Sequence, residues 1–146
     1  MAMDLFKELR KMRILLIDDD KWIRDSMAMF FEGEGCHLSV CETAEEGLEA
    51  LKNHDCQAII ADYLLPGMDG LEFFRRISET HRGVMKILIT AYGNQKIFSE
   101  AESIGVESVI EKPFTVEILK QSLARLLKVK SQKIRCGTMQ RRGGEK

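Results

Sequence analysis

The sequence predicts an α/β fold, in which a parallel β-sheet carries helices on both of its faces. Five short apolar runs alternate along the chain with five segments of helical periodicity. The first, third and fourth runs are almost continuously hydrophobic, as expected of strands buried on both faces of a sheet. Strict alternation of strand and helix favours parallel pairing and right-handed crossovers. The 146 residues are enough for one such domain with a hydrophobic core of its own.

The expected strands follow from apolar, largely β-branched runs bounded by polar residues. In chain order they are Arg13–Ile17, His37–Cys41, Gln57–Ala61, Lys86–Ile89 and Val106–Ile110. Apolar residues three or four positions apart predict helices between and after them, around residues 23–31, 43–54, 71–77, 97–104 and 115–126. Thr43 with Glu46 three residues later is a capping-box pattern, which marks the start of the second of these helices.

The chain divides into a short extension, one domain and a tail. Residues 1–11 form the extension, with a short helix expected around Leu5, and residues 12–129 form the domain. Helical periodicity stops after about Val129. From Lys128 to Lys146 there are seven Lys or Arg and one acid, so the body is acidic and the tail basic. With few apolar residues, the segment 130–146 is expected to be disordered.

Composition points to a cytoplasmic protein. The formal net charge of −1 argues neither for nor against a polyanionic partner. No apolar run approaches the roughly 20 residues that a membrane span needs, and the N-terminus does not resemble a secretory signal. The four cysteines show no C-x-x-C spacing, so reduced thiols are expected rather than a zinc site or disulfides.

Polar residues suited to metal and phosphate binding follow the strands. In chain order they are Asp18–Asp20, Glu42, Asp62, Thr90 and Glu111–Lys112. The carboxyl ends of parallel strands meet at one edge of the sheet, where ligands of doubly wound folds bind. Adjacent carboxylates about 4 Å apart repel by roughly 4 kcal/mol at an effective dielectric near 20, and Mg²⁺ with its preference for hard oxygen ligands removes that cost. The pattern therefore favours a site at which a phosphoryl group is placed on an aspartate.

Over about residues 12–129 the sequence resembles a known family, the receiver domains of two-component response regulators. The matching segments are ILLIDDD, IIADYLLPGMDGLEF, ILITAYG and VIEKPF, in the order and spacing of that family. Any one segment occurs often by chance, but all of them in one five-fold β/α frame make a specific signal. The resemblance implies a flavodoxin-like fold, (βα)5, with sheet order 2-1-3-4-5.

The resemblance implies roles for the acids. Asp62 would be the phospho-acceptor, and Mg²⁺ would be held by Asp19 directly, by Asp18 mainly through water, by Asp62, and by the backbone carbonyl of Leu64. A partner histidine kinase or phosphotransfer protein would supply the phosphoryl group from a phosphohistidine. The domain would be no enzyme beyond catalysing its own phosphorylation and slow autodephosphorylation.

The resemblance also implies how the signal is formed. Thr90 would bind the phosphoryl group and move inward with it, Lys112 would pair with the aspartate and phosphoryl oxygens, and the Lys112–Pro113 peptide would be cis, a form that costs little only before proline. The output would be a conformational change passed on through protein–protein contacts with a downstream protein, since no DNA-binding segment follows residue 129. The resemblance leaves open whether the domain forms a homodimer.

Three further positions modulate this scheme. Leu64 and Tyr92 lie two residues after the acceptor and the threonine, where the family controls hydrolysis, and their bulk predicts slow loss of phosphate. The family usually has an aromatic residue three positions before the lysine, and here that position is Val109. An aliphatic side chain leaves the usual threonine–aromatic switch in doubt, so phosphorylation could be read through the helix around residues 97–104 instead.

Two other functions compete with this one. A pseudo-receiver would be an interaction module that no longer uses phosphate, and Val109 is its best support. A haloacid-dehalogenase-type phosphatase would use Asp18 and Asp20 as nucleophile and acid. That motif should continue with Thr or Val where this chain has Trp22, and it leaves Asp62 and Lys112 without a role.

Overall fold

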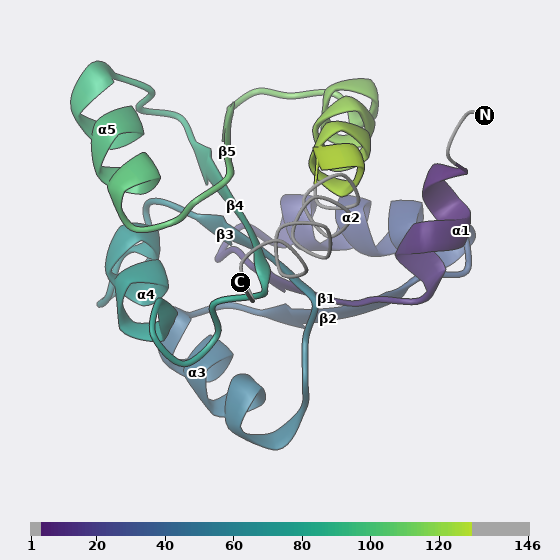
Figure 1. Cartoon of the computed structure of the whole chain (residues 1–146), viewed down its shortest axis with the longest axis horizontal. Coiled ribbons are helices and arrows are strands. Elements are labelled where there is room, and N and C mark those ends of the chain that lie inside the picture. The colour runs from purple at the N-terminus through teal and green to yellow at the C-terminus, as the bar shows by residue number, and fades with distance from the viewer. Residues whose placement is uncertain (1–3, 130–146) are drawn as a thin grey trace, which may run out of the picture.

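The protein is a five-stranded parallel sheet with helices on both faces, seen in a computed structural model that describes residues 4–129 (Figure 1). The strands are β1 (Arg13–Ile17), β2 (His37–Cys41), β3 (Ala58–Asp62), β4 (Met85–Thr90) and β5 (Ser108–Glu111). Their order across the sheet is β2-β1-β3-β4-β5, and every neighbouring pair is parallel. The predicted fold class and strand order are thus confirmed. The predicted bounds of β1 and β2 are also confirmed, and those of the other strands differ by one or two residues at each end.

The helices occupy the segments predicted from periodicity. They are α1 (Leu5–Arg10), α2 (Lys21–Gly33), α3 (Ala44–Asn53), α4 (Gly70–Ile77), α5 (Gln95–Ser103) and a further helix over residues 116–129. The predicted capping box is present at α3, where Thr43 Oγ1 accepts from the Glu46 N–H at 3.1 Å and Glu46 Oε1 accepts from the Thr43 N–H at 3.2 Å. The tail predicted for residues 130–146 lies outside the described residues.

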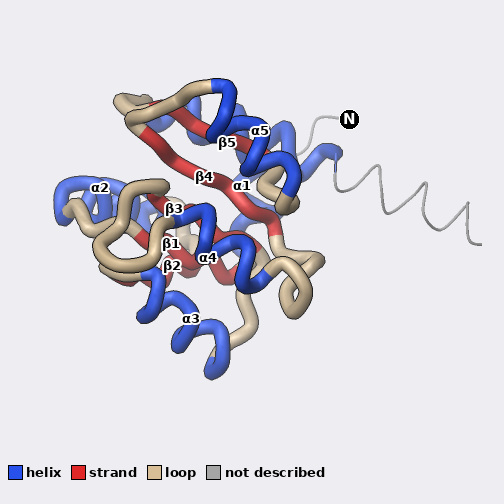
Figure 2. The backbone as a smooth tube through the Cα atoms, turned by 90° about the vertical axis from the view of Figure 1, so that its left-hand side faces the viewer, coloured by secondary structure: helices blue, strands red, loops and turns tan. Residues whose placement is uncertain are grey.

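The two faces of the sheet carry separate apolar clusters, because side chains alternate along each strand. On β1, Ile14 and Leu16 pack under α1, α2 and the 116–129 helix. Leu15 and Ile17 point the other way, toward α3, α4 and α5. The two sets of helices lie on opposite sides of the sheet in Figure 1, and Figure 2 views the molecule from the α3–α5 side.

The N-terminal helix α1 belongs to the first of these clusters. Leu9 is fully buried there. The Phe6 ring meets that of Phe30 edge-on at 5.9 Å between centroids, and Arg10 Nε donates to the Glu34 carbonyl at 2.8 Å. This helix is therefore packed against α2 and not held away from the sheet. Among residues 4–129, no helix combines the length and the apolar character needed to cross a bilayer.

Candidate functional site

The carboxyl edge of the sheet gathers the polar residues that the sequence placed after its strands. Asp62 and Thr90 are the last residues of β3 and β4, and Asp18 directly follows β1, which pairs with β3. Asp18 and Thr90 are fully buried and Asp62 is 5% exposed. Carboxylate oxygens of Asp18, Asp19 and Asp62 lie within 4.8 Å of one another, close enough for one cation to contact all three.

Lys112 is the cation that the fold brings to these acids. It follows β5, and its own N–H donates to the Thr90 carbonyl at 2.8 Å, which fixes its backbone beside β4. Its Nζ lies 2.9 Å from Asp62 Oδ2 and 3.4 Å from Asp18 Oδ2. Burial lowers the pKa of Lys112, but the hydrogen bond to Asp62 and the charges of both aspartates outweigh it and raise this pKa overall. The Lys112–Pro113 peptide is cis, as expected.

Asp18 carries the electrostatic cost of the site. Burial raises its pKa from 3.8 to about 6, and the Asp62 charge adds to this against the opposing effects of the Asp20 N–H and Lys112. Asp18 Oδ1 accepts from the Asp20 N–H at 2.9 Å. Within residues 4–129, Asp18 Oδ2 has no hydrogen-bond partner, since Lys112 stands at ion-pair distance without hydrogen-bond geometry. A buried carboxylate oxygen with free lone pairs is a suitable ligand for a hard cation.

A cleft of about 420 Å³ opens above these acids. Its lining residues are Asp19, Asp20, Asp62, Leu64, Leu65, Pro66, Ala91, Tyr92 and Lys112. Leu64 and Tyr92 stand at its rim with 56% of each residue exposed. Thr90 lies beneath it, and its Oγ1 accepts from the Tyr92 N–H at 2.9 Å. The threonine hydroxyl is therefore tied to the loop that carries Tyr92.

Val109 and Gly70 have surroundings in the structure that the sequence predicted only in part. Val109 is half-buried on β5 and packs with the cluster on the α3–α5 side, away from the acidic cleft. Gly70 begins α4 so close to β3 that a Cβ there would collide with the backbone carbonyl of Asp62. The glycine thus lets the helix start directly against the end of the strand that carries Asp62.

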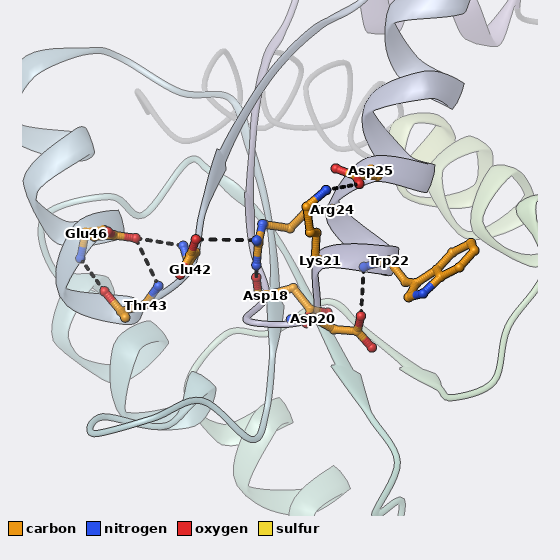
Figure 3. A network of polar contacts seen from close by, with 9 residues as sticks. All are labelled: Asp18, Asp20, Lys21, Trp22, Arg24, Asp25, Glu42, Thr43 and Glu46. Atoms are coloured by element: carbon orange, nitrogen blue, oxygen red, sulfur yellow. Dashed lines mark hydrogen bonds and ion pairs between the residues drawn. The ribbon is translucent and has the colours of Figure 1, made fainter.

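Sequence reasoning missed Arg24, which lies behind the acidic loop (Figure 3). Its guanidinium donates to the Asp18 carbonyl at 2.9 Å and reaches Glu42 at 3.4 Å. An arginine on an amphipathic helix is ordinarily read as solvated, so the six-residue spacing from Asp18 carried no signal of its own.

Fold and site together define a class of protein: a flavodoxin-like α/β domain with carboxylates, a hydroxyl and a lysine at the carboxyl edge of its sheet. The family model of the response regulator receiver domain matches residues 14–124. The chain therefore belongs to the response regulator receiver domain family.

Individual relatives agree with this assignment. The chain is 26% identical over 119 residues to the sporulation initiation phosphotransferase F of Bacillus subtilis, covering 82% of this chain and 96% of that protein. It is 35% identical over 112 residues to the C4-dicarboxylate transport transcriptional regulatory protein DctD of Rhizobium meliloti, covering 77% of this chain but only 24% of that one. In another curated relative it spans 31% of the length.

A solved structure gives the same result. The response regulator receiver domain protein (CheY-like) of Methanospirillum hungatei superposes with a TM-score of 0.78 at 29% identity, covering 83% of this chain and 97% of that one. The chain is thus a receiver domain of the two-component signalling type, a class whose members interact with histidine kinases and downstream effectors.

Proposed function

We propose that the chain is a phosphorylation-dependent switch that accepts a phosphoryl group on Asp62 from the phosphohistidine of a histidine kinase or phosphotransfer protein. The observation that carries the proposal is the grouping around Asp62. One of its oxygens is 2.9 Å from Lys112 Nζ, and the buried Asp18 oxygen without a hydrogen-bond partner lies beside the same ammonium. A nucleophile, a counter-charge and a cation ligand meet there at the floor of a cleft.

Receiver domains generally bind Mg²⁺ through acidic residues, and the residues present here fit that ion. Asp18, Asp19 and Asp62 would hold it, with the backbone carbonyl of Leu64 at the cleft rim as a further ligand. The buried Asp18 Oδ2, which lacks a hydrogen-bond partner within residues 4–129, supports this fit. Bound Mg²⁺ supplies positive charge that offsets the carboxylate repulsion and the charge developing on the transferred oxygens.

The chain's own residues then account for the transfer. An Asp62 carboxylate oxygen attacks phosphorus in line, so that an O–P bond forms while the N–P bond to the histidine breaks. Lys112 stays against Asp62 and faces the incoming oxygens. Thr90, now accepting from the Tyr92 N–H, turns its hydroxyl toward the phosphoryl group and draws the loop with it.

The same loop gives the proposed output and lifetime of the signal. Val109 cannot present a ring or hydroxyl, so the movement of Thr90 and Tyr92 is passed to α5, which begins shortly after this loop at Gln95. Leu64 and Tyr92 shield the acyl phosphate from water, which gives slow autodephosphorylation.

The test is intact-protein mass after incubation with acetyl phosphate, with and without Mg²⁺, for the wild type and Asp62→Asn. The expected result is a Mg²⁺-dependent gain of one phosphoryl group in the wild type and no gain in the variant. A wild type that stays unmodified would contradict the proposal and favour the pseudo-receiver. A gain that persists in Asp62→Asn would overturn the choice of acceptor.

A further inference from the structure

Arg24 joins three segments, namely the loop after β1, the first turn of α2 and the turn after β2 (Figure 3). It lies on the first turn of α2, its Nη1 donates to the main-chain oxygen of Asp18 at 2.9 Å, and its Nη2 is 3.4 Å from Glu42 Oε1 just past β2. The Arg24 side chain is 14% exposed, whereas that of Glu42 is 64% exposed. The guanidinium is thus largely enclosed, and its shorter contact is the one to the backbone.

The carbonyl that Arg24 holds belongs to the peptide unit between Asp18 and Asp19. On the other side of Asp18, its N–H donates to the Cys41 carbonyl at 3.0 Å. Further along, the Asp20 N–H donates to Asp18 Oδ1 at 2.9 Å. With Arg24 in place, this short loop is fixed on both sides of Asp18. The plane of the Asp18–Asp19 peptide sets the direction in which the Asp19 side chain leaves the backbone.

Charge alone would give Arg24 the opposite effect on a bound cation. A guanidinium near three carboxylates repels a divalent ion, so removing it should tighten cation binding if charge were its only contribution. Removing a residue that orients the ligands should weaken binding instead. The two roles therefore predict effects of opposite sign.

We propose that Arg24 is a positioning residue for the metal site, which holds the Asp18–Asp19 peptide so that both carboxylates face one cation. The inference rests on the proposed function, because it takes the acidic cluster to bind Mg²⁺. It adds a residue on α2 to the set that determines metal affinity, through a main-chain contact and without touching the ion.

Titration of Mg²⁺ by isothermal calorimetry on the full chain tests this. Arg24→Gln should weaken Mg²⁺ binding about tenfold, as is typical when an outer partner of a metal ligand is lost. Arg24→Lys keeps the charge but cannot contact both the Asp18 carbonyl and Glu42. Its Mg²⁺ binding should therefore be weaker than that of the wild type, but less so than in Arg24→Gln. Lys21→Gln is the matched control, because Lys21 is on the same helix, is 78% exposed and pairs with Asp25. It removes the same charge and should bind Mg²⁺ as tightly as the wild type or more tightly.

Circular dichroism without metal establishes that each variant is folded before titration. An Arg24→Gln variant that binds Mg²⁺ as tightly as the wild type, or more tightly, overturns the positioning role. Should Arg24→Gln not fold, Arg24→Lys decides, and an unchanged dissociation constant there overturns the role equally. A wild type that binds no Mg²⁺ would instead overturn the proposed function, and this inference with it.

Discussion

At the scale of one residue, Asp18 lowers the stability of the metal-free fold in a way that a bound cation would reverse. Its carboxylate is fully buried, one oxygen lacks a hydrogen-bond partner within residues 4–129, and burial together with the nearby Asp62 raises its pKa to about 6. Leaving a buried polar atom without a partner costs about 1–3 kcal/mol. The folded chain without metal therefore carries a cost at this position that a bound cation would relieve.

The first prediction follows from that cost. Asp18→Asn should raise the free energy of unfolding of the metal-free protein by about 1 kcal/mol, since the amide removes a buried charge and its oxygen can still accept from the Asp20 N–H. The same change should abolish the stabilisation given by added Mg²⁺. Urea unfolding with EDTA and with Mg²⁺ measures both effects. Asp25→Asn, an exposed acid on α2, is the control and should change neither, and a destabilised metal-free Asp18→Asn would contradict the argument.

Cys56 gives a prediction of pH dependence. Burial raises the pKa of its thiol from 9.0 to about 11, although hydrogen bonds with the backbone at Ala58 and Leu15 oppose this. Because the thiolate is the reactive form, native Cys56 should react with iodoacetamide at pH 8 about 100-fold more slowly than in urea. Since the folded pKa is raised, the stability linked to this group is present below pH 9 and is lost as the pH rises through about 11. Mass spectrometry of the Cys56 peptide over time measures the rate, and equal rates in the two states would refute the burial argument.

At the scale of elements, the strand β3, which carries the proposed acceptor Asp62, is in direct contact with the helix α4 that follows it. Asp69 caps α4 by accepting from the Glu72 N–H at 2.8 Å, and the Gly70 N–H donates to the Tyr63 carbonyl at 2.9 Å. The first turn of α4 is thus bonded to the residue after Asp62, and the absence of a side chain at Gly70 permits the approach.

Gly70→Ala should therefore slow phosphorylation. The new Cβ would press on the Asp62 carbonyl and displace the acceptor, and misplacements of this size cost roughly 10- to 100-fold in rate. The rate of labelling by acetyl phosphate at saturating Mg²⁺ measures it. Gly33→Ala is the control, because nothing lies within 4 Å of a Cβ added at this last residue of α2. An unchanged rate in Gly70→Ala would show that the contact does not position Asp62.

The elements also show what the sequence could predict. Alternation and capping patterns predict the helices and the exact limits of β1 and β2, because these depend on neighbours along the chain. Val106 was wrongly assigned to β5. Its N–H donates to the Ala101 carbonyl at 2.9 Å, following Gly105 with φ +91°, so it closes the end of α5. Arg24 could not be predicted at all, since its partner is a main-chain oxygen whose position only the folded sheet defines.

At the scale of the whole molecule, one sheet separates two apolar clusters that cannot unfold independently. The same strand β1 contributes Ile14 and Leu16 to one cluster and Leu15 and Ile17 to the other. Loss of packing on either face should therefore destabilise both.

Leu9→Ala tests whether the two clusters unfold together, because Leu9 belongs to the first cluster only. Leu9 on α1 is fully buried, so the truncation should lower the global free energy of unfolding by about 2–5 kcal/mol. Urea unfolding followed by far-ultraviolet circular dichroism, which reports helix content, and by near-ultraviolet circular dichroism, which reports aromatic packing, should give a single coincident transition. Lys7→Ala, at an exposed position on the same helix, should leave the midpoint almost unchanged. Separate transitions by the two probes would show that the two clusters do not unfold together.

A second hollow, with Trp22, Phe30, Ala91, Lys112 and Phe114 among its lining residues, lies beside the acidic cleft, and the rim of the two differs from the acidic floor. Trp22 is 82% exposed, and Leu64 and Tyr92 are each 56% exposed, around acids that the strands hold in place. Ala91 and Lys112 line both hollows, so the two surfaces are continuous. Under the proposed function, phosphoryl transfer depends on the acids of the floor, whereas partner contacts and the lifetime of the phosphate depend on the rim. After gene duplication, a copy that changes its rim would therefore alter its signalling partner and its signal lifetime together, while the transfer step is retained.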